Sequence, residues 1–216
     1  SLGEGGGRVG GGSKAASGQI AALAKKRRAD AIAARKKAAI AAANKKIALS
    51  NTLTAKAETF LDNDKTDLAI DNYRAALVQN SRNTRASEGL SNALTAKGID
   101  VAGDTNNEAA IALFEEAVKY DKQNDVAYAK AGAIYDAKGK NDRAALNYEK
   151  ALAINPAYTM LYPPLGVAYL DNGEIAKAET TLQKANAAGI DTAETRFLSG
   201  VILFKQNKNT EALSAF

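Results

Sequence analysis

The sequence predicts an all-α protein built from stacked helix pairs, and three observations support this. A set of Tyr, Gly, Ala and Pro positions recurs with a fixed period over much of the chain, for example at Tyr128 and again at Tyr162. Each copy places small and aromatic residues at helical spacings, which is typical of two packed helices. Residues 19–63 contain neither glycine nor proline, and residues 21–48 are dominated by Ala, Lys and Arg, which favour helix.

The first element in chain order is a glycine-rich segment, residues 1–17, which predicts a flexible linker. Ser17 is a suitable N-cap for the basic helix that we expect over residues 18–49. Its large apolar residues form only a loose stripe, which is too irregular to predict a coiled coil. No run of about 18 apolar residues occurs, so no transmembrane segment is predicted. The bacterial cytoplasm and the periplasm or cell envelope are both compatible with this sequence.

Charge is distributed unevenly between this segment and the rest of the chain. The whole sequence has 29 Lys and Arg against 24 Asp and Glu, a net charge of +5. Residues 1–49 contain eleven basic and two acidic side chains, or +9, which leaves −4 for the rest of the chain. The chain therefore combines a basic segment with a mildly acidic body.

The repeat follows this segment. One copy consists of Tyr128, Gly132, Tyr135, Gly139, Ala144, Tyr148, Ala151 and Pro156. The same spacing, started again at the next period, reaches Tyr162, Gly166, Tyr169, Gly173, Ala178, Leu182, Ala185 and Ile190. Started further upstream, it reaches Leu53, Ala57, Phe60, Asp64, Ala69, Tyr73, Ala76 and Ser81. One helix pair cannot bury its apolar face alone, so such units are expected to stack.

This pattern resembles the tetratricopeptide repeat (TPR) family, whose unit of about 34 residues has small and aromatic residues at these positions. The resemblance covers residues 50–216 and implies a right-handed α-solenoid of antiparallel helix pairs. Its units are 50–83, 84–124, 125–158, 159–192 and 193–216. The second unit has seven extra residues, which we place around Gly98 to Asn107 as a lengthened first helix ending near Gly103 or as a loop. The last unit is incomplete, so we expect the chain to be part of a larger multidomain protein or assembly.

Catalysis is not expected. The sequence has no Cys, His or Trp, which excludes thiol nucleophiles, disulfides, Cys/His zinc sites and Ser-His-Asp triads. Acidic pairs such as Glu115–Glu116 fall on helix faces that we expect to be solvated. We therefore predict no enzyme activity, no cofactor and no metal site.

The family resemblance implies a binding groove along one face of the first helices, at the second, fifth, ninth and twelfth positions of each unit. The candidate groove residues are Arg85, Asn92, Ala129, Ala133, Asp136, Met160, Val167, Leu170, Phe197, Val201 and Phe204. Family members that hold acidic chaperone tails use Lys, Asn and Arg at such positions, and the third and fourth units lack them. The groove is therefore expected to bind an apolar or amphipathic protein segment. The alternative is that these residues pack against a neighbouring helix or a second copy of the chain.

The basic helix allows three interpretations. Its basic patch consists of Lys25, Lys26, Arg27, Arg28, Arg35, Lys36 and Lys37. It could contact nucleic-acid phosphates, lie on an anionic membrane surface, or act as a solvated spacer, which is the favoured interpretation. The nucleic-acid contact is the main alternative function for the chain.

Overall fold

The computed structural model describes residues 11–103 and 107–215, with side chains from Ala16 onward. The chain divides into two compact units, Ser1–Leu49 and Ser50–Phe216. Helices α1 to α10 and one short 3-10 helix, η1, make up the described part of the chain, which contains no strand. The two units are described separately below.

Helix α1 (Gly11–Leu61) begins seven residues before the expected start at Gly18. Ser17 therefore lies inside the helix rather than at its N-cap. Extending a helix that already exists adds one hydrogen bond per residue, and Lys14, Ala15 and Ala16 are good helix formers. The rest of the expected linker, residues 1–10, lies outside the described residues. Every described side chain from Ala16 to Leu49 is exposed.

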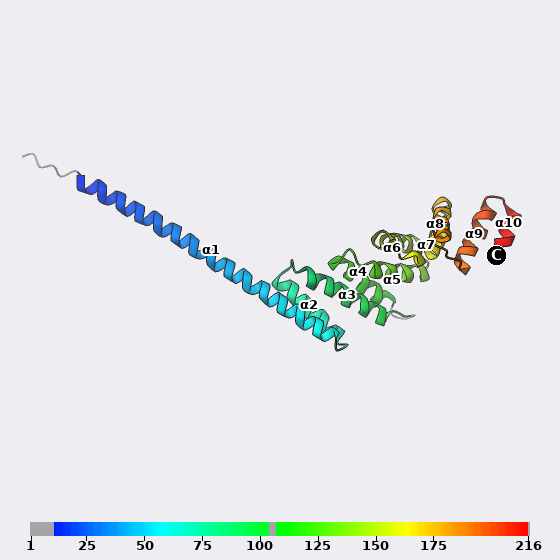
Figure 1. Cartoon of the computed structure of the whole chain (residues 1–216), viewed down its shortest axis with the longest axis horizontal. Helices are drawn as coiled ribbons and strands as arrows, with labels where there is room; N and C mark the ends of the chain where they lie inside the picture. The colour runs from blue at the N-terminus through cyan, green and yellow to red at the C-terminus, as the bar shows by residue number, and fades with distance from the viewer. Residues whose placement is uncertain (1–10, 104–106, 216) are drawn as a thin grey trace, which may run out of the picture. The chain divides into compact units, whose positions relative to one another are not determined.

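The compact unit Ser50–Phe216 consists of helix pairs, each packed against the next (Figure 1). Its first helix is the end of α1, from Ser50, followed by α2 (Thr66–Gln79). The later pairs are α3 (Thr84–Val101) with α4 (Asn107–Tyr120), α5 (Asp125–Ala137) with α6 (Asn141–Ile154), α7 (Tyr162–Asp171) with α8 (Ile175–Ala187), and α9 (Ala193–Lys205) with α10 (Asn209–Ala215). The second helix of each pair also contacts the first helix of the following pair. This arrangement is a helical repeat solenoid.

Close approach of the two helices explains the small residues of the repeat. A Cβ atom at Gly132 would lie 2.8 Å from the ring of Tyr148, and one at Gly98 would lie 2.6 Å from the ring of Phe114. Tyr148 and Phe114 are both buried, with 2% and 1% of their surface exposed. Each aromatic ring therefore fills a space that exists because the facing helix has a glycine.

The same contacts locate the seven extra residues of the second repeat, residues 84–124. Gly98 and Phe114 precede Gly132 and Tyr148 by one repeat period each, so residues 91–124 align with residues 125–158 without a gap. The extra residues are therefore 84–90, the first two turns of α3, which has 18 residues where α5 has 13. The expected lengthened helix is present and ends at Val101, but its placement around Gly98 to Asn107 is wrong. Seven residues are nearly two full turns, so the buried face stays in phase.

Proline marks the start of α7. Pro163 and Pro164 fall in the first turn of this helix, which begins at Tyr162. A first-turn proline is tolerated because its missing N–H would have no partner within the helix. The preceding residues Thr159–Leu161 form the 3-10 helix η1.

Candidate functional site

The first helices of the pairs, together with η1 before α7, carry the predicted groove residues, but not all of these are accessible. Arg85, Asn92, Ala133, Met160, Phe197 and Phe204 are exposed, and Asp136, Val167 and Val201 are half-buried. Ala129 and Leu170 are only 4% and 8% exposed and belong to the hydrophobic core. These two residues cannot present a contact surface to a partner.

Burial at the fifth position of the units explains the error at Ala129. Thr54 and Thr95 occupy this position in the first two units, and both are buried. Thr54 is contacted by Asn83, and Thr95 by Asn124, each of which directly precedes the first helix of the next unit. In these two units the fifth position therefore lies beneath the start of the following unit, whereas Phe197, at the fifth position of the last unit, is 45% exposed.

Ile99 is an exposed residue at a predicted groove position that the sequence spacing missed. Because residues 91–124 align with 125–158, Ile99 occupies the ninth position of its unit, equivalent to Ala133. It is 42% exposed. Gly98 and Gly132 are one repeat period apart. This spacing identifies Ile99 as a ninth position once the extra residues are placed at the start of the helix.

Exposed large apolar side chains recur on the described TPR units, and we call five of them the apolar strip: Ile99, Val126, Met160, Phe197 and Phe204. All five occupy the second, fifth, ninth or twelfth position of a unit. Ile99 and Val126 line one open pocket of about 330 Å³ together with Asn92. Phe204 and Val201 line a second pocket of about 370 Å³ with Leu213. The pocket at Phe204 is lined mainly by apolar side chains, whereas Ile99 and Val126 lie among polar residues in the other pocket.

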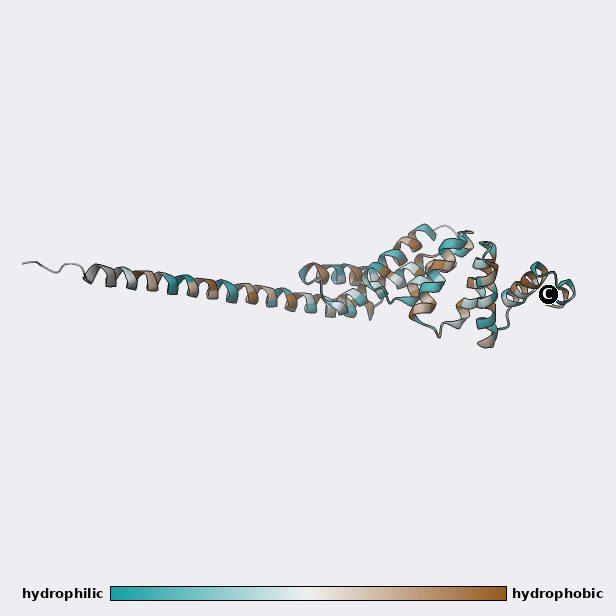
Figure 2. Cartoon of the chain, turned by 90° about the horizontal axis from the view of Figure 1, so that it is seen from above, coloured by the Kyte–Doolittle hydropathy of each residue, from teal (hydrophilic) through white to brown (hydrophobic). Residues whose placement is uncertain are grey.

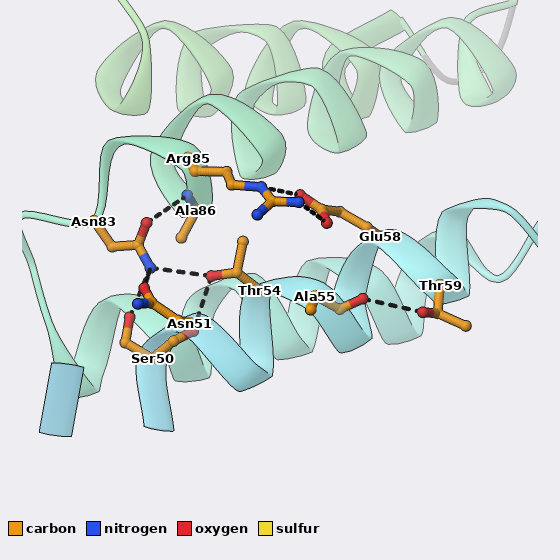
Figure 3. Close-up of polar contacts among 9 residues, drawn as sticks. All are labelled: Ser50, Asn51, Thr54, Ala55, Glu58, Thr59, Asn83, Arg85 and Ala86. Atoms are coloured by element: carbon orange, nitrogen blue, oxygen red, sulfur yellow. Dashed lines mark hydrogen bonds and ion pairs between the residues drawn. The ribbon is translucent and has the colours of Figure 1, made fainter. Parts of the chain in front are cut away.

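A buried polar contact ties the first two units together (Figure 3). The side-chain amide of Asn83 donates to the hydroxyl oxygens of Ser50, at 2.9 Å, and Thr54, at 3.1 Å. Its carbonyl oxygen accepts a hydrogen bond from the backbone N–H of Ala86 at 3.1 Å, which caps α3. Ser50 in turn donates to the carbonyl oxygen of Ala76 at 2.8 Å. One asparagine therefore starts a helix and fixes it to the preceding unit.

The same contact is repeated at the junction between the second and third units. The Asn124 amide donates to Ser91 and Thr95, both at 2.9 Å, and its carbonyl oxygen accepts from the N–H of Ala127 at 2.9 Å. Thr95 and Asn124 also line the pocket that contains Ile99. The polar wall of that pocket is consequently held in place by hydrogen bonds within the protein.

Arg85 does not present a free cation. Its Nε and Nη2 atoms donate to the two carboxylate oxygens of Glu58 at 2.6 and 2.5 Å (Figure 3). A bidentate pair of this kind occupies the carboxylate-binding side of the guanidinium. The predicted groove residue Arg85 is therefore already neutralised by its neighbour.

Charged and phenolic side chains form a second repeated contact between units. The Tyr135 hydroxyl donates to Glu115 at 2.7 Å, and Arg143 lies over the Tyr135 ring at 5.3 Å from its centre. One period later, Tyr169 donates to Glu149, and Lys177 lies over the Tyr169 ring at 5.0 Å. Burial, reinforced by the hydrogen bonds to these glutamates, raises the pKa of Tyr135 and of Tyr169 above the usual value. Both hydroxyls consequently remain protonated donors at neutral pH.

Acidic residues of helices α4 and α5 have structural partners. Glu115 accepts from Tyr135, and Glu116 forms an ion pair with Arg74 at 2.7 Å. Burial raises the pKa of Asp136, although the Tyr148 hydroxyl that donates to it at 3.4 Å acts in the opposite direction. Among the described residues, no group of three or more acidic side chains is arranged to hold a metal ion.

The basic patch lies on α1 and is fully accessible. All seven predicted residues from Lys25 to Lys37 are exposed, as are Lys45 and Lys46 further along the same helix. In the described part of the chain, no helix has the length and apolar character needed to cross a membrane.

Comparison with known families decides the classification. One tetratricopeptide repeat model matches residues 54–102 and 164–216, and a second matches residues 126–158. The chain belongs to the tetratricopeptide repeat family. The matched segments lie in the second unit, Ser50–Phe216, and together span more than half of the chain. No curated protein matches the sequence significantly.

Several solved structures are similar to this chain. YrrB, described as a TPR protein with an unusual peptide-binding site, is 17% identical with a TM-score of 0.53, over 76% of this chain and 80% of its own. MamA is 26% identical with a TM-score of 0.43, over 64% of this chain and 77% of its own. PilF of Pseudomonas aeruginosa is 18% identical with a TM-score of 0.46, over 77% and 72%. The likeness to YrrB shows the fold of the TPR array.

Membership of this family makes the chain a protein–protein interaction scaffold of a generally non-catalytic class. The TPR units position short helices at regular intervals, so side chains at equivalent positions form continuous surfaces. What such a surface binds depends on the side chains that this particular chain places there.

Proposed function

We propose that the TPR array binds an apolar or amphipathic segment of a partner protein along the apolar strip. The observation that supports this proposal is the exposure of large apolar side chains at several of the predicted groove positions, although only Val126 and Met160 occupy the same position in their units. Met160 is 60% exposed and Phe204 is 65% exposed. Contiguous exposed apolar surface is uncommon on soluble proteins and is frequently an interaction site.

The charge of this surface argues against acidic tails as ligands. The third and fourth units carry Ala129 and Ala133, then Pro163 and Val167, at the positions where chaperone-binding relatives use polar and basic residues. In the first two units the available cation, Arg85, is paired with Glu58. A partner segment with Leu, Phe or Met at regular spacings fits the apolar strip better than a carboxylate-rich one.

The proposal is tested by selecting peptides from a random library against the full chain and measuring their affinity by fluorescence polarisation. Met160→Arg removes apolar surface and introduces a charge, and burial of one such side chain contributes about 1.5–3 kcal/mol. We expect the variant to weaken binding of the selected peptides by about tenfold or more.

Leu146→Arg is the matched control. Leu146 is also exposed, at 49%, but it lies on α6, a second helix of a pair, outside the apolar strip. This control should bind the selected peptides as the wild type does. Equal weakening in both variants, or selection of predominantly acidic peptides, would contradict the proposal. Dimerisation that Phe204→Arg abolishes would instead favour contact between two copies of the chain.

A further inference from the structure

The basic helix differs from the TPR array in how its charges are neutralised. In the described part of the array, six basic side chains form ion pairs with acidic ones, namely Arg74, Arg85, Lys97, Lys138, Lys177 and Arg196. Residues 16–49 of α1 contain nine basic side chains and one acidic side chain, Asp30. All of them are exposed, and within the described part of the chain none of them forms an ion pair. This segment therefore carries a formal charge of +8 without internal compensation.

The charges surround the helix. Each residue of an α-helix turns the chain by about 100°, so the four consecutive residues Lys25, Lys26, Arg27 and Arg28 cover nearly the whole circumference. The apolar residues are spread as well, since Ile32 lies about 120° and Ile40 about 200° from Ile20 around the axis. Figure 2 shows hydrophilic and hydrophobic residues alternating along α1.

This arrangement bears on the two anionic partners considered above. A helix that lies in a membrane surface immerses a continuous apolar face, and residues 16–49 have none. A coiled coil needs an apolar seam, which is also absent. Contact with phosphates requires only accessible cations at short intervals along the helix. The distribution of charge therefore favours contact with phosphates over immersion in a lipid bilayer.

We propose that the segment Lys25–Lys46 of α1 binds the phosphate backbone of nucleic acid without sequence preference. The segment is about 33 Å long at about 1.5 Å per residue, and duplex DNA carries about one negative charge per 1.7 Å. Residues 16–49 contain no aromatic side chain that could stack on a base. Binding is consequently driven by release of counterions from the duplex. The segment contains no residue of the apolar strip, so the proposal does not depend on the proposed function of the TPR array.

The test titrates the full chain into a fluorescent DNA duplex of arbitrary sequence at several salt concentrations. Five to nine phosphate contacts predict a slope of about −4 to −8 in a plot of log affinity against log salt. Between about 50 and 200 mM salt, affinity should then fall by about 10² to 10⁵. Substituting Lys25, Lys26, Arg27 and Arg28 by Gln should reduce the magnitude of the slope by about 2 to 4.

A matched control changes the net charge by the same amount elsewhere. Lys119, Lys122, Lys130 and Lys184 are exposed residues of the TPR array, and their substitution by Gln should leave the slope unchanged. Circular dichroism verifies that both variants remain helical. A further variant of the basic helix, with Arg35, Lys36 and Lys37 substituted by Gln, tests whether the salt slope also decreases when charges are removed from another part of the helix.

Absence of duplex binding at low salt would overturn the proposal and leave α1 as a spacer. Equal loss of slope in the control variant would overturn it too, because the charge of the whole chain would then be responsible. Vesicles containing phosphatidylglycerol form the third arm of the experiment. Binding to these vesicles without binding to the duplex would assign the helix to a lipid surface instead.

Discussion

At the scale of single residues, Asn83 and Asn124 each combine two tasks. An asparagine N-cap satisfies one backbone N–H at the start of a helix. Here the same side chain also donates to two buried hydroxyls of the preceding unit, Ser50 and Thr54 for Asn83. Both asparagines are nearly inaccessible, at 9% and 6% exposure. Their replacement therefore affects helix initiation and the junction between units together.

Asn124→Ala should destabilise the protein by about 2–4 kcal/mol. Loss of the cap contributes about 1 kcal/mol, and the buried hydroxyls of Ser91 and Thr95 each lose a hydrogen-bond partner. The measurement is urea unfolding followed by circular dichroism. Asn147→Ala is the control, because the Asn147 amide donates to the Arg143 carbonyl of its own helix and not across a junction. A cost no larger than that of the control would show that the junction contributes nothing.

At the scale of helices, the packing of the α3–α4 and α5–α6 pairs depends on a glycine facing an aromatic ring. The extension of α3 follows the same principle toward the preceding unit, since a Cβ atom at Gly89 would lie 2.4 Å from the Tyr73 ring. The two added turns of α3 therefore contact α2 rather than extending into solvent. Helix length and packing are linked in this unit because the extension preserves the phase of the buried face.

Gly132→Ala should lower the stability of the protein although alanine favours helix. The new Cβ atom would meet Tyr148 at 2.8 Å, and overpacking of this kind costs about 1–3 kcal/mol against a propensity gain of about 1 kcal/mol. The cost should shrink when the same change is made in a Tyr148→Leu background. Gly18→Ala, with nothing within 4 Å, tests the propensity gain alone and should raise helicity. Stabilisation by Gly132→Ala in the wild-type background would contradict this account of the pair.

At the scale of the whole molecule, residues 16–49 of α1 and the TPR array are stabilised by different interactions. The TPR array has a continuous core that includes buried residues from Ala57 to Ile202. Residues 16–49 of α1 bury nothing, so their helix depends on the intrinsic preferences of Ala, Lys and Arg. Charge separates in the same way, with +9 in residues 1–49 and −4 in the remainder.

Hydrogen exchange should therefore differ sharply between the two units. Amides of residues 16–49 should exchange orders of magnitude faster than those of α4 to α6, because a helix without tertiary contacts frays and reforms rapidly. Mass spectrometry of peptic fragments measures this directly, and unfolding in urea provides the fully exchanged reference. Protection of residues 16–49 equal to that of α5 would indicate that another surface covers this helix.

Spacing alone predicted much of the fold and part of the candidate site. The repeat period predicted the helix pairs, because glycine has few alternatives where two helices approach closely. Ala129 and Leu170 were misjudged because exposure at a given position depends on how the helices pack, and Ile99 was missed because the extra residues of the 84–124 repeat were placed too late in the helix. The spacing of one repeat period between Gly98 and Gly132 is consistent with extra turns at the start of α3, and the contact between Gly98 and Phe114 identifies that register.

Local sequence thus determined which residues form helices, where those helices repeat, and how charge is divided along the chain. These properties follow from backbone preferences and short-range spacing, which act within one or two turns. The tertiary structure alone decided which groove residues are accessible and which cations are neutralised. Those outcomes depend on contacts between residues far apart in sequence, as between Arg85 and Glu58 or between Asn124 and Thr95. Such contacts exist only once neighbouring units have stacked.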